Sequence, residues 1–175
     1  MPPTRTLYLL RHAKSSWDDP QLEDHERPLA PRGRRAVAAL ADHVRSVGIE
    51  PEVILCSSAR RTRETLEGVD PPGERMIEPD LYEASVEGVL GRLQQLPDGV
   101  RSAMVIGHNP TLQVLALRLA SPGGGASHSG DWAELQRKFS TGALATLSFG
   151  GAWSDLAPGC AQLTAYVRPR QLERR

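Results

Sequence analysis

The stretch LYLLRHAKSSW, residues 7–17, begins as a strand and ends in charged and polar side chains. Residues 6–10 form a short apolar run rich in strand-forming types, which predicts a buried β-strand. Arg11 and His12 follow directly. A guanidinium and an imidazole therefore stand at the tip of a buried strand, and the rest of the sequence indicates why.

Strands and helices alternate along the rest of the chain. Apolar runs predict further strands at 52–58, 101–108, 142–149 and 161–167, and a short extended piece followed by a loop at 76–85. Helices are predicted at 33–48, 59–69, 86–96, 109–120 and 132–139. This order predicts one α/β domain over residues 1–175, a three-layer sandwich whose mainly parallel central sheet has helices on both faces.

Single residues set several of the expected boundaries. Ser58 is the expected N-cap of the second predicted helix, and Pro110 is expected at the first position of the fourth. Gly48 is expected to end the first helix. The segment at 121–131, SPGGGASHSGD, is predicted to be a loop, and the polar tail at 168–175 is expected to fray.

The composition argues against several classes of protein. Lys and Arg number 21, as do Asp and Glu, so the chain lacks the basic excess of a nucleic-acid-binding protein. No apolar run approaches the ~20 residues of a membrane span, and the N-terminal segment lacks a signal peptide's long apolar stretch. Cys56 and Cys160 make no disulfide framework, and Cys56 is expected to be a buried free thiol. The expected location is the reducing cytoplasm.

Charged and polar residues follow three of the predicted strands. Arg11 and His12 follow the first, SSARR with Arg60 and Arg61 follows the second, and His108 follows the third. The carboxyl ends of parallel strands share one edge of a sheet, where ligands bind. Two imidazoles, Arg11 and either Arg60 or Arg61 are therefore expected to converge beside two helix N-termini.

This group of residues indicates phosphoryl transfer. Guanidinium groups and helix N-termini bind phosphate oxygens. A neutral imidazole is a competent nucleophile toward phosphorus. The arginines and the second imidazole can offset the charge of the transition state without a metal. The predicted reaction passes through a phosphohistidine on the protein itself.

Five motifs in order add a resemblance to a known family. The stretches are LLRHAKSSW, ERPLAPRG, SSARRTRETLE, LYEAS and VIGHNP. Their order resembles that of the histidine phosphatase superfamily, which also holds the phosphoglycerate mutases. The RHAKSSW, RPL and GHNP forms resemble its small SixA-like branch, the phosphohistidine phosphatases. The resemblance covers nearly the whole chain and implies the phosphoglycerate mutase-like fold.

The resemblance implies a role for each site residue. His12 would be the nucleophile, and His108 would be the second imidazole, which holds phosphate oxygens. Arg11 and Arg61 would bind phosphate, Arg61 being the family's arginine four residues after the serine that ends the second strand. Glu83, in LYEAS, falls near the position of a proton donor, and an acid can protonate a leaving group.

The expected function is metal-independent and cofactor-free dephosphorylation. A short chain without large insertions leaves an open, shallow site, which suits phosphohistidine on a protein surface. A small-molecule phosphomonoesterase is the alternative enzyme. A non-catalytic phosphate-binding module is a third possibility, against which the complete set of Arg11, His12, Arg61 and His108 argues. The expected partner is thus a phosphorylated protein or a small phosphate ester, and neither nucleic acid nor membrane.

Overall fold

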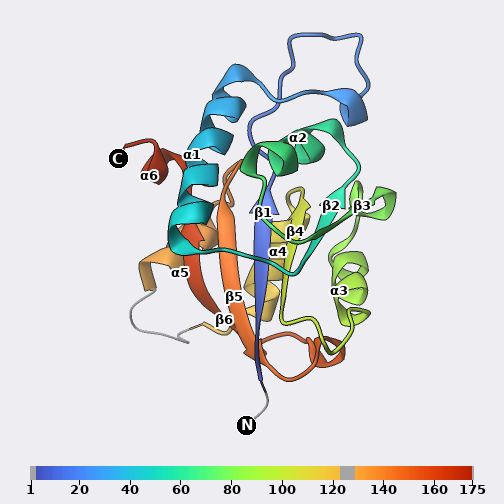
Figure 1. The fold of residues 1–175 in the computed structure, drawn as a ribbon, viewed down its shortest axis with the longest axis vertical. Coiled ribbons are helices and arrows are strands. Elements are labelled where there is room, and N and C mark those ends of the chain that lie inside the picture. Colours follow the sequence, from blue (N-terminus) through green and yellow to red (C-terminus); the bar gives the residue numbers. More distant parts are fainter. Residues whose placement is uncertain (1–2, 123–128, 175) are drawn as a thin grey trace.

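In the computed structural model, which describes residues 3–122 and 129–174, six strands form one sheet. They are β1 (Thr4–Arg11), β2 (Val53–Ser57), β3 (Glu74–Glu78), β4 (Ser102–Gly107), β5 (Leu144–Gly150) and β6 (Ala161–Val167). The order across the sheet is β3-β2-β4-β1-β5-β6. The first strand of the chain therefore lies inside the sheet, between β4 and β5 (Figure 1).

The four strands β1 to β4 are parallel, while β5 pairs antiparallel with both β1 and β6. Ile106 of β4 is level with Leu10 of β1 on one side and with Cys56 of β2 on the other. The carboxyl ends of these three strands therefore lie together at one edge. The expected mainly parallel sheet and its common edge are confirmed.

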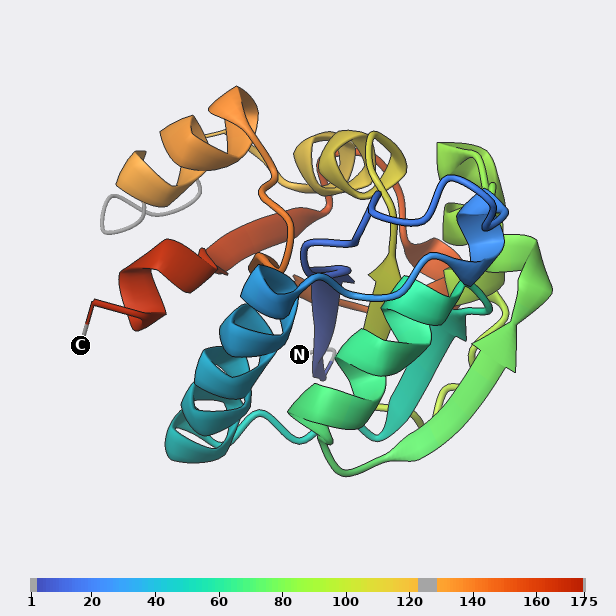
Figure 2. The ribbon, with the colours of Figure 1, turned by 90° about the horizontal axis from the view of Figure 1, so that it is seen from above.

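Helices cover both faces of the sheet (Figure 2). They are α1 (Pro31–Val47), α2 (Arg60–Val69), α3 (Val86–Gln94), α4 (Thr111–Leu119), α5 (Ser129–Arg137) and α6 (Pro169–Leu172). Successive strand residues point to opposite faces, so Ile54 packs in the core under α1 and α2 while Leu55 packs in the core under α3 and α4. The three-layer α/β sandwich is confirmed. Within the two described ranges, no helix combines the length and apolarity of a membrane span.

Two expected helix starts are wrong. The N-cap of α2 is Ala59, whose N–H donates to the Ser57 hydroxyl, whereas the Ser58 hydroxyl is hydrogen-bonded to Nε2 of His25. Pro110 is the N-cap of α4 and not its first residue. By contrast Gly48 ends α1 as expected, with a left-handed φ of 72°. At α2 the Ser58 side chain is taken up by His25, so it does not cap the helix and the cap position falls on Ala59.

The C-terminal part of the chain is more regular than expected. The tail forms α6, whose buried Leu172 packs into the core under α1, so it does not fray as a whole. The predicted loop at 121–131 falls largely on residues 123–128, which lie outside the described residues. Residues 129–131 open α5.

The strand β3 occupies residues 74–78, where the sequence predicted a short extended piece beginning at residue 76.

Gly33 allows α1 to rest on the backbone that follows β1. A Cβ at this position would lie 2.1 Å from the carbonyl oxygen of Lys14. The N–H of Ala30 donates to the same carbonyl at 2.9 Å. The first turn of α1 thus supports the chain two residues beyond His12, in a space that a larger residue cannot share.

We expect Gly33→Ala to destabilise the protein by about 1–3 kcal/mol, because the added methyl group meets backbone that cannot rotate away. Urea denaturation measures this change. Gly91→Ala in α3 is the matched control, since its Cβ meets no atom within 4 Å and alanine stabilises a helix by ~1 kcal/mol over glycine. A Gly33→Ala variant as stable as wild type would contradict this account of the packing.

Candidate active site

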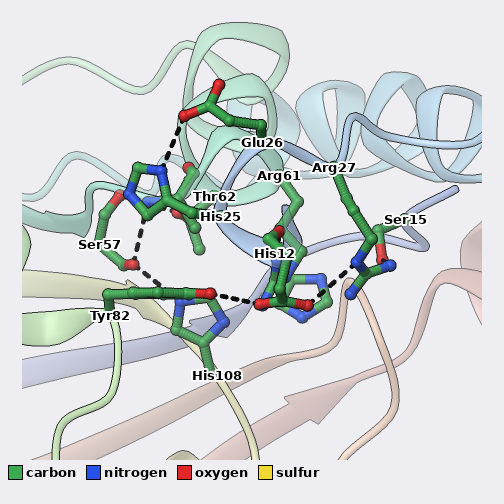
Figure 3. A network of polar contacts seen from close by, with 12 residues as sticks. His12, Ser15, His25, Glu26, Arg27, Ser57, Arg61, Thr62, Tyr82 and His108 are labelled. Atoms are coloured by element: carbon green, nitrogen blue, oxygen red, sulfur yellow. Dashed lines mark hydrogen bonds and ion pairs between the residues drawn. The ribbon is translucent and has the colours of Figure 1, made fainter. Parts of the chain in front are cut away.

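His12, Arg61 and His108 lie together at the carboxyl edge of the sheet (Figure 3). The ring centroids of His12 and His108 are 5.3 Å apart, with the ring planes at 53°. The positive charges of Arg11 and Arg61 both act on the two imidazoles. The three strand ends singled out in the sequence therefore do bring their side chains to one place.

The backbone fixes the tautomer of His12. Its Nδ1 lies 2.8 Å from the carbonyl oxygen of Ala13. A carbonyl oxygen can only accept a hydrogen bond, so Nδ1 carries the proton and donates it. In a neutral imidazole the other nitrogen, Nε2, is then unprotonated and has a free lone pair. His12 thus presents a nucleophilic nitrogen.

Both imidazoles are held in the neutral state. Burial lowers the pKa of His12 to about 3, helped by the charges of His108, Arg61 and Arg11, while the hydrogen bond to Ala13 acts in the opposite direction. Burial followed by the charge of Arg61 lowers the pKa of His108 to about 4. At neutral pH neither ring needs to lose a proton before it can act.

His108 is oriented by the end of β2. Its Nε2 lies 2.7 Å from the hydroxyl oxygen of Ser57, which is fully buried. The same hydroxyl accepts a hydrogen bond from the N–H of Ala59, so it is fixed by the start of α2. The sequence identified Ser57 only as the strand-end serine from which Arg61 is counted, and it did not predict the contact of Ser57 with His108.

Arg61 is the arginine of the SSARR segment that faces the site. It is 6% exposed, and its two terminal nitrogens donate to the backbone carbonyl and the carboxylate of Asp24, at 2.8 and 3.0 Å. Its Nε is buried and has no hydrogen-bond partner among the described residues. Arg60 is exposed and pairs with Glu64 one turn further along α2. The choice between the two arginines falls on Arg61, as the resemblance implied.

Asp24 joins three side chains at the rim of the site. It opens the short 3-10 helix η1 (Asp24–Glu26). Its carboxylate accepts hydrogen bonds from Arg61, from Nε of Arg27 at 3.0 Å and from the hydroxyl of Tyr82. Burial raises the pKa of Asp24, but the hydrogen bonds from Tyr82 and Arg61 lower it more, so the carboxyl is ionised. The net direction is well below the ordinary value.

Local sequence patterns indicate few of the contacts around Asp24. A carboxylate three residues before Arg27 was available as a signal for their ion pair. The contact between Tyr82 and Asp24 spans 58 positions, and no local pattern indicates it. Arg27 also donates to the hydroxyl of Ser15 at 2.7 Å. Through Asp24 and Ser15, Arg27 therefore orders this loop beside the site.

Arg11 is anchored to the segment that follows α5. One terminal nitrogen donates to the carbonyl oxygen of Phe139 at 2.8 Å, and its Nε is buried without a partner among the described residues. Arg11 and Arg61 therefore each hold a buried N–H group that has no acceptor. A tetrahedral oxyanion supplies acceptors in several directions, and guanidinium groups bind such ions well.

Glu83 lies on the wall of a cavity of about 350 Å³ beside the His108 imidazole. Arg61, Tyr82 and His108 line the same cavity, whose inner part is apolar. The Glu83 side chain is exposed and forms no ion pair among the described residues. It is thus placed where it can reach a group bound near His108. Over residues 3–122 and 129–174, no group of three or more His, Cys, Asp or Glu side chains has a metal-binding arrangement.

Comparisons of sequence identify relatives of this chain. A family model described as the histidine phosphatase superfamily (branch 1) matches residues 7–100. The uncharacterized protein Rv1276c of Mycobacterium tuberculosis is 38% identical over 163 residues, which cover 92% of this chain and 100% of that protein. The uncharacterized chloroplastic protein At3g52155 of Arabidopsis thaliana is 33% identical, covering 95% of this chain and 78% of that protein.

Solved structures share the fold. A protein from Nakamurella multipartitia, assigned as the phosphohistidine phosphatase SixA, has a TM-score of 0.83 at 35% identity, covering 97% of this chain and 99% of that one. The protein histidine phosphatase SixA in complex with tungstate has a TM-score of 0.76 at 25% identity, covering 95% of this chain and 99% of that one. The phosphoglycerate mutase-like α/β fold is confirmed by these matches.

We expect stability to fall on acidification because His12 is buried in its neutral form. Its pKa is about 3 when folded and near 6.5 when unfolded, so below pH 6.5 the unfolded chain alone takes up the proton. Between about pH 7.5 and about pH 5, wild type should lose about 2 kcal/mol more unfolding free energy than His12→Gln. Urea denaturation at the two pH values measures the difference.

The control is Thr62→Val, which removes a buried hydroxyl but no titratable group. Its loss of stability relative to wild type should be the same at both pH values. If wild type and His12→Gln respond equally to acid, His12 is not buried as a neutral imidazole.

Proposed function

Because this chain belongs to the histidine phosphatase superfamily, we propose that it is a metal-independent phosphatase that removes phosphate from phosphohistidine on a protein. Membership confirms the resemblance drawn from the motifs. One observation carries the proposal beyond the family: Nδ1 of His12 donates to Ala13, so Nε2 is unprotonated in a site that also holds the charges of Arg61 and Arg11. His12 is the residue that forms the covalent intermediate.

The first step transfers phosphate to the enzyme. Nε2 of His12 attacks phosphorus, a P–N bond forms to this nitrogen, and the P–N bond to the substrate imidazole breaks. The electron pair of the broken bond stays on the leaving nitrogen, which takes a proton from solvent or from Glu83. Arg11, Arg61 and His108 stabilise the charge on the phosphoryl oxygens. The carbonyl of Ala13 stabilises the positive charge that develops on the His12 ring.

The second step releases phosphate from His12. Water attacks the phosphorus, the P–N bond to Nε2 breaks, and the electron pair returns to the ring. The water gives up one proton, for which the carboxylate of Glu83 or the phosphate itself is the acceptor. Low pKa values at His12 and His108 support this cycle, since both rings return to the neutral form at neutral pH.

Two features support a phosphohistidine substrate over other phosphate compounds. The relatives with the same fold and 25–35% identity include proteins named as SixA phosphohistidine phosphatases. Transfer of a phosphoryl group from one imidazole to another also changes the free energy little, so the leaving imidazole does not depend on a strong acid. A small-molecule phosphomonoesterase is the second candidate, favoured by the cavity of about 350 Å³ that places Glu83 near His108.

The test compares three substrates in the presence of EDTA: a protein carrying phosphohistidine, a phosphoserine peptide and an aryl phosphate. We expect the highest kcat/KM with phosphohistidine. His12→Ala should abolish turnover of all three, and rapid quenching of wild type should trap acid-labile phosphate on the enzyme. Arg60→Ala, which removes an exposed arginine outside the site, is the control and should keep full activity.

Each other outcome points elsewhere. Turnover of the aryl phosphate alone, or of small esters alone, would identify a phosphomonoesterase. Binding of inorganic phosphate without any turnover would identify a phosphate-binding module. Activity that disappears with EDTA and returns with a divalent metal would overturn the metal-independent chemistry.

Glu83→Gln tests the proton donor separately. An alkoxide is a poor leaving group and needs a proton, so kcat/KM for the phosphoserine peptide should fall by roughly 100-fold or more. The aryl phosphate and phosphohistidine have better leaving groups and should change by only about threefold, since the same acid contributes less to them. Glu87→Gln removes an exposed carboxylate of α3 that pairs with Arg118, and it should leave all three rates unchanged. A uniform loss across the substrates would mean that Glu83 positions the site and donates no proton.

A further inference from the structure

A second cavity, of about 460 Å³, lies beside the active site and is lined mainly by cations. Arg11 forms part of its wall. Six more lining residues are positively charged, and they are Lys14, Arg32, Arg137, Lys138, Arg168 and Arg170. Both lysines of the chain are among them. On a chain with zero net charge, this is a strong local concentration of positive charge.

Several segments contribute to the cavity. Lys14 lies two residues after His12, Arg32 lies in the first turn of α1, Arg137 ends α5, and Arg170 lies in α6. The ribbon seen from above shows α5 and α6 on one side of the molecule, beside α1 (Figure 2). Segments far apart in sequence thus direct cations to one opening. Neighbouring like charges repel each other, so the arrangement costs stability unless an anion binds there.

Carboxylates of the protein neutralise little of this charge. Glu134 accepts from both Arg137 and Arg168 at 2.9 Å. Among the described residues, the other lining cations form no ion pair with a carboxylate; they are Arg11, Lys14, Arg32, Lys138 and Arg170. Glu173 lines the cavity without forming an ion pair there. In addition, Nε of Arg168 and Nε of Arg11 are buried without a hydrogen-bond partner in the described part of the chain. The cavity therefore offers unused donors as well as unused charge.

The cavity and the active site share Arg11. This residue directly precedes His12, and its charge reaches both imidazoles. A molecule bound in the cavity therefore lies next to a phosphoryl group bound at His12. The outer cations are exposed side chains spread over several segments, and such a layout suits several carboxylates on a surface better than one enclosed ion.

We propose that this basic cavity, lined by Arg11, Lys14, Arg32, Lys138, Arg168 and Arg170, docks a carboxylate-rich segment of the protein that carries the phosphohistidine. The proposal rests on the proposed function and deepens it, since it names a feature that substrates must share. Docking of this kind acts on association and on KM, because exposed charges steer a partner before contact. It leaves the chemistry at His12 unchanged.

The test uses two phosphohistidine peptides that differ only in their flanking residues, Asp and Glu in one, Asn and Gln in the other. At low salt, wild type should show roughly tenfold higher kcat/KM for the acidic peptide, through KM, and salt should remove the preference. The variant Lys138→Glu/Arg170→Glu should lose the preference. The Lys138→Glu/Arg170→Glu variant should still hydrolyse an aryl phosphate at the wild-type rate, which shows that its active site is folded.

The matched control is Arg35→Glu/Arg101→Glu. It makes the same change of charge at two exposed arginines that do not line this cavity, and it should keep the preference for the acidic peptide. A preference that is absent in wild type, or that survives Lys138→Glu/Arg170→Glu, would overturn the docking proposal. So would an equal loss in both double variants, since that would show an effect of overall charge alone.

A binding measurement separates this proposal from the proposed function. His12→Ala is titrated with the unphosphorylated acidic peptide, labelled for fluorescence anisotropy, with and without Lys138→Glu/Arg170→Glu. Binding weakened roughly tenfold or more by the double variant supports the cavity even if wild type hydrolyses no phosphohistidine peptide. If inorganic pyrophosphate binds and the acidic peptide does not, the docking proposal is overturned, and the cavity is a site for a small anion.

Discussion

The pairing of β1 with β4 is the constraint on which the site depends. Arg11 is level with Gly107, and the N–H of His12 donates to the carbonyl of Gly107 at 3.1 Å. The next residue on each strand is a histidine, so parallel register alone places His12 beside His108. A slip of one residue would turn one imidazole toward the opposite face of the sheet. The apolar residues that fix this register are therefore also what aligns the site.

Burial and backbone contacts then determine the chemistry of the two rings. Withdrawal from water keeps His12 and His108 neutral, and the Ala13 carbonyl decides which nitrogen of His12 is free. Burying the two arginine side chains away from water would be unfavourable without a counter-charge. Asp24 supplies one to Arg61, and its own ionised state is stabilised in return. The site thus combines neutral rings with a positive charge that its neighbours only partly balance.

The sequence predicted the strands and the edge where they end because burial and periodicity are local patterns. It also predicted that His12, His108 and an arginine of the SSARR segment would meet. It did not predict Ser57 or Asp24 as partners of the site residues, since each contact joins segments brought together only by the fold. Ser58 is the converse case. A serine suits a helix cap, yet the Ser58 hydroxyl is hydrogen-bonded to His25 of η1, which precedes it by 33 positions.

The central position of β1 also has a consequence for how the chain folds. Residues 4–11 are made before their neighbours in the sheet, residues 102–107 and 144–150. Contacts this distant in sequence form slowly, because a long loop must lose conformational entropy before the contacts contribute favourable free energy. During synthesis the apolar strand that precedes His12 therefore stays without its sheet neighbours until residues 102–107 and then 144–150 have been made. The alignment of His12 with His108 is then complete only after β4 has been made, and until then β1 is a segment in need of protection from aggregation.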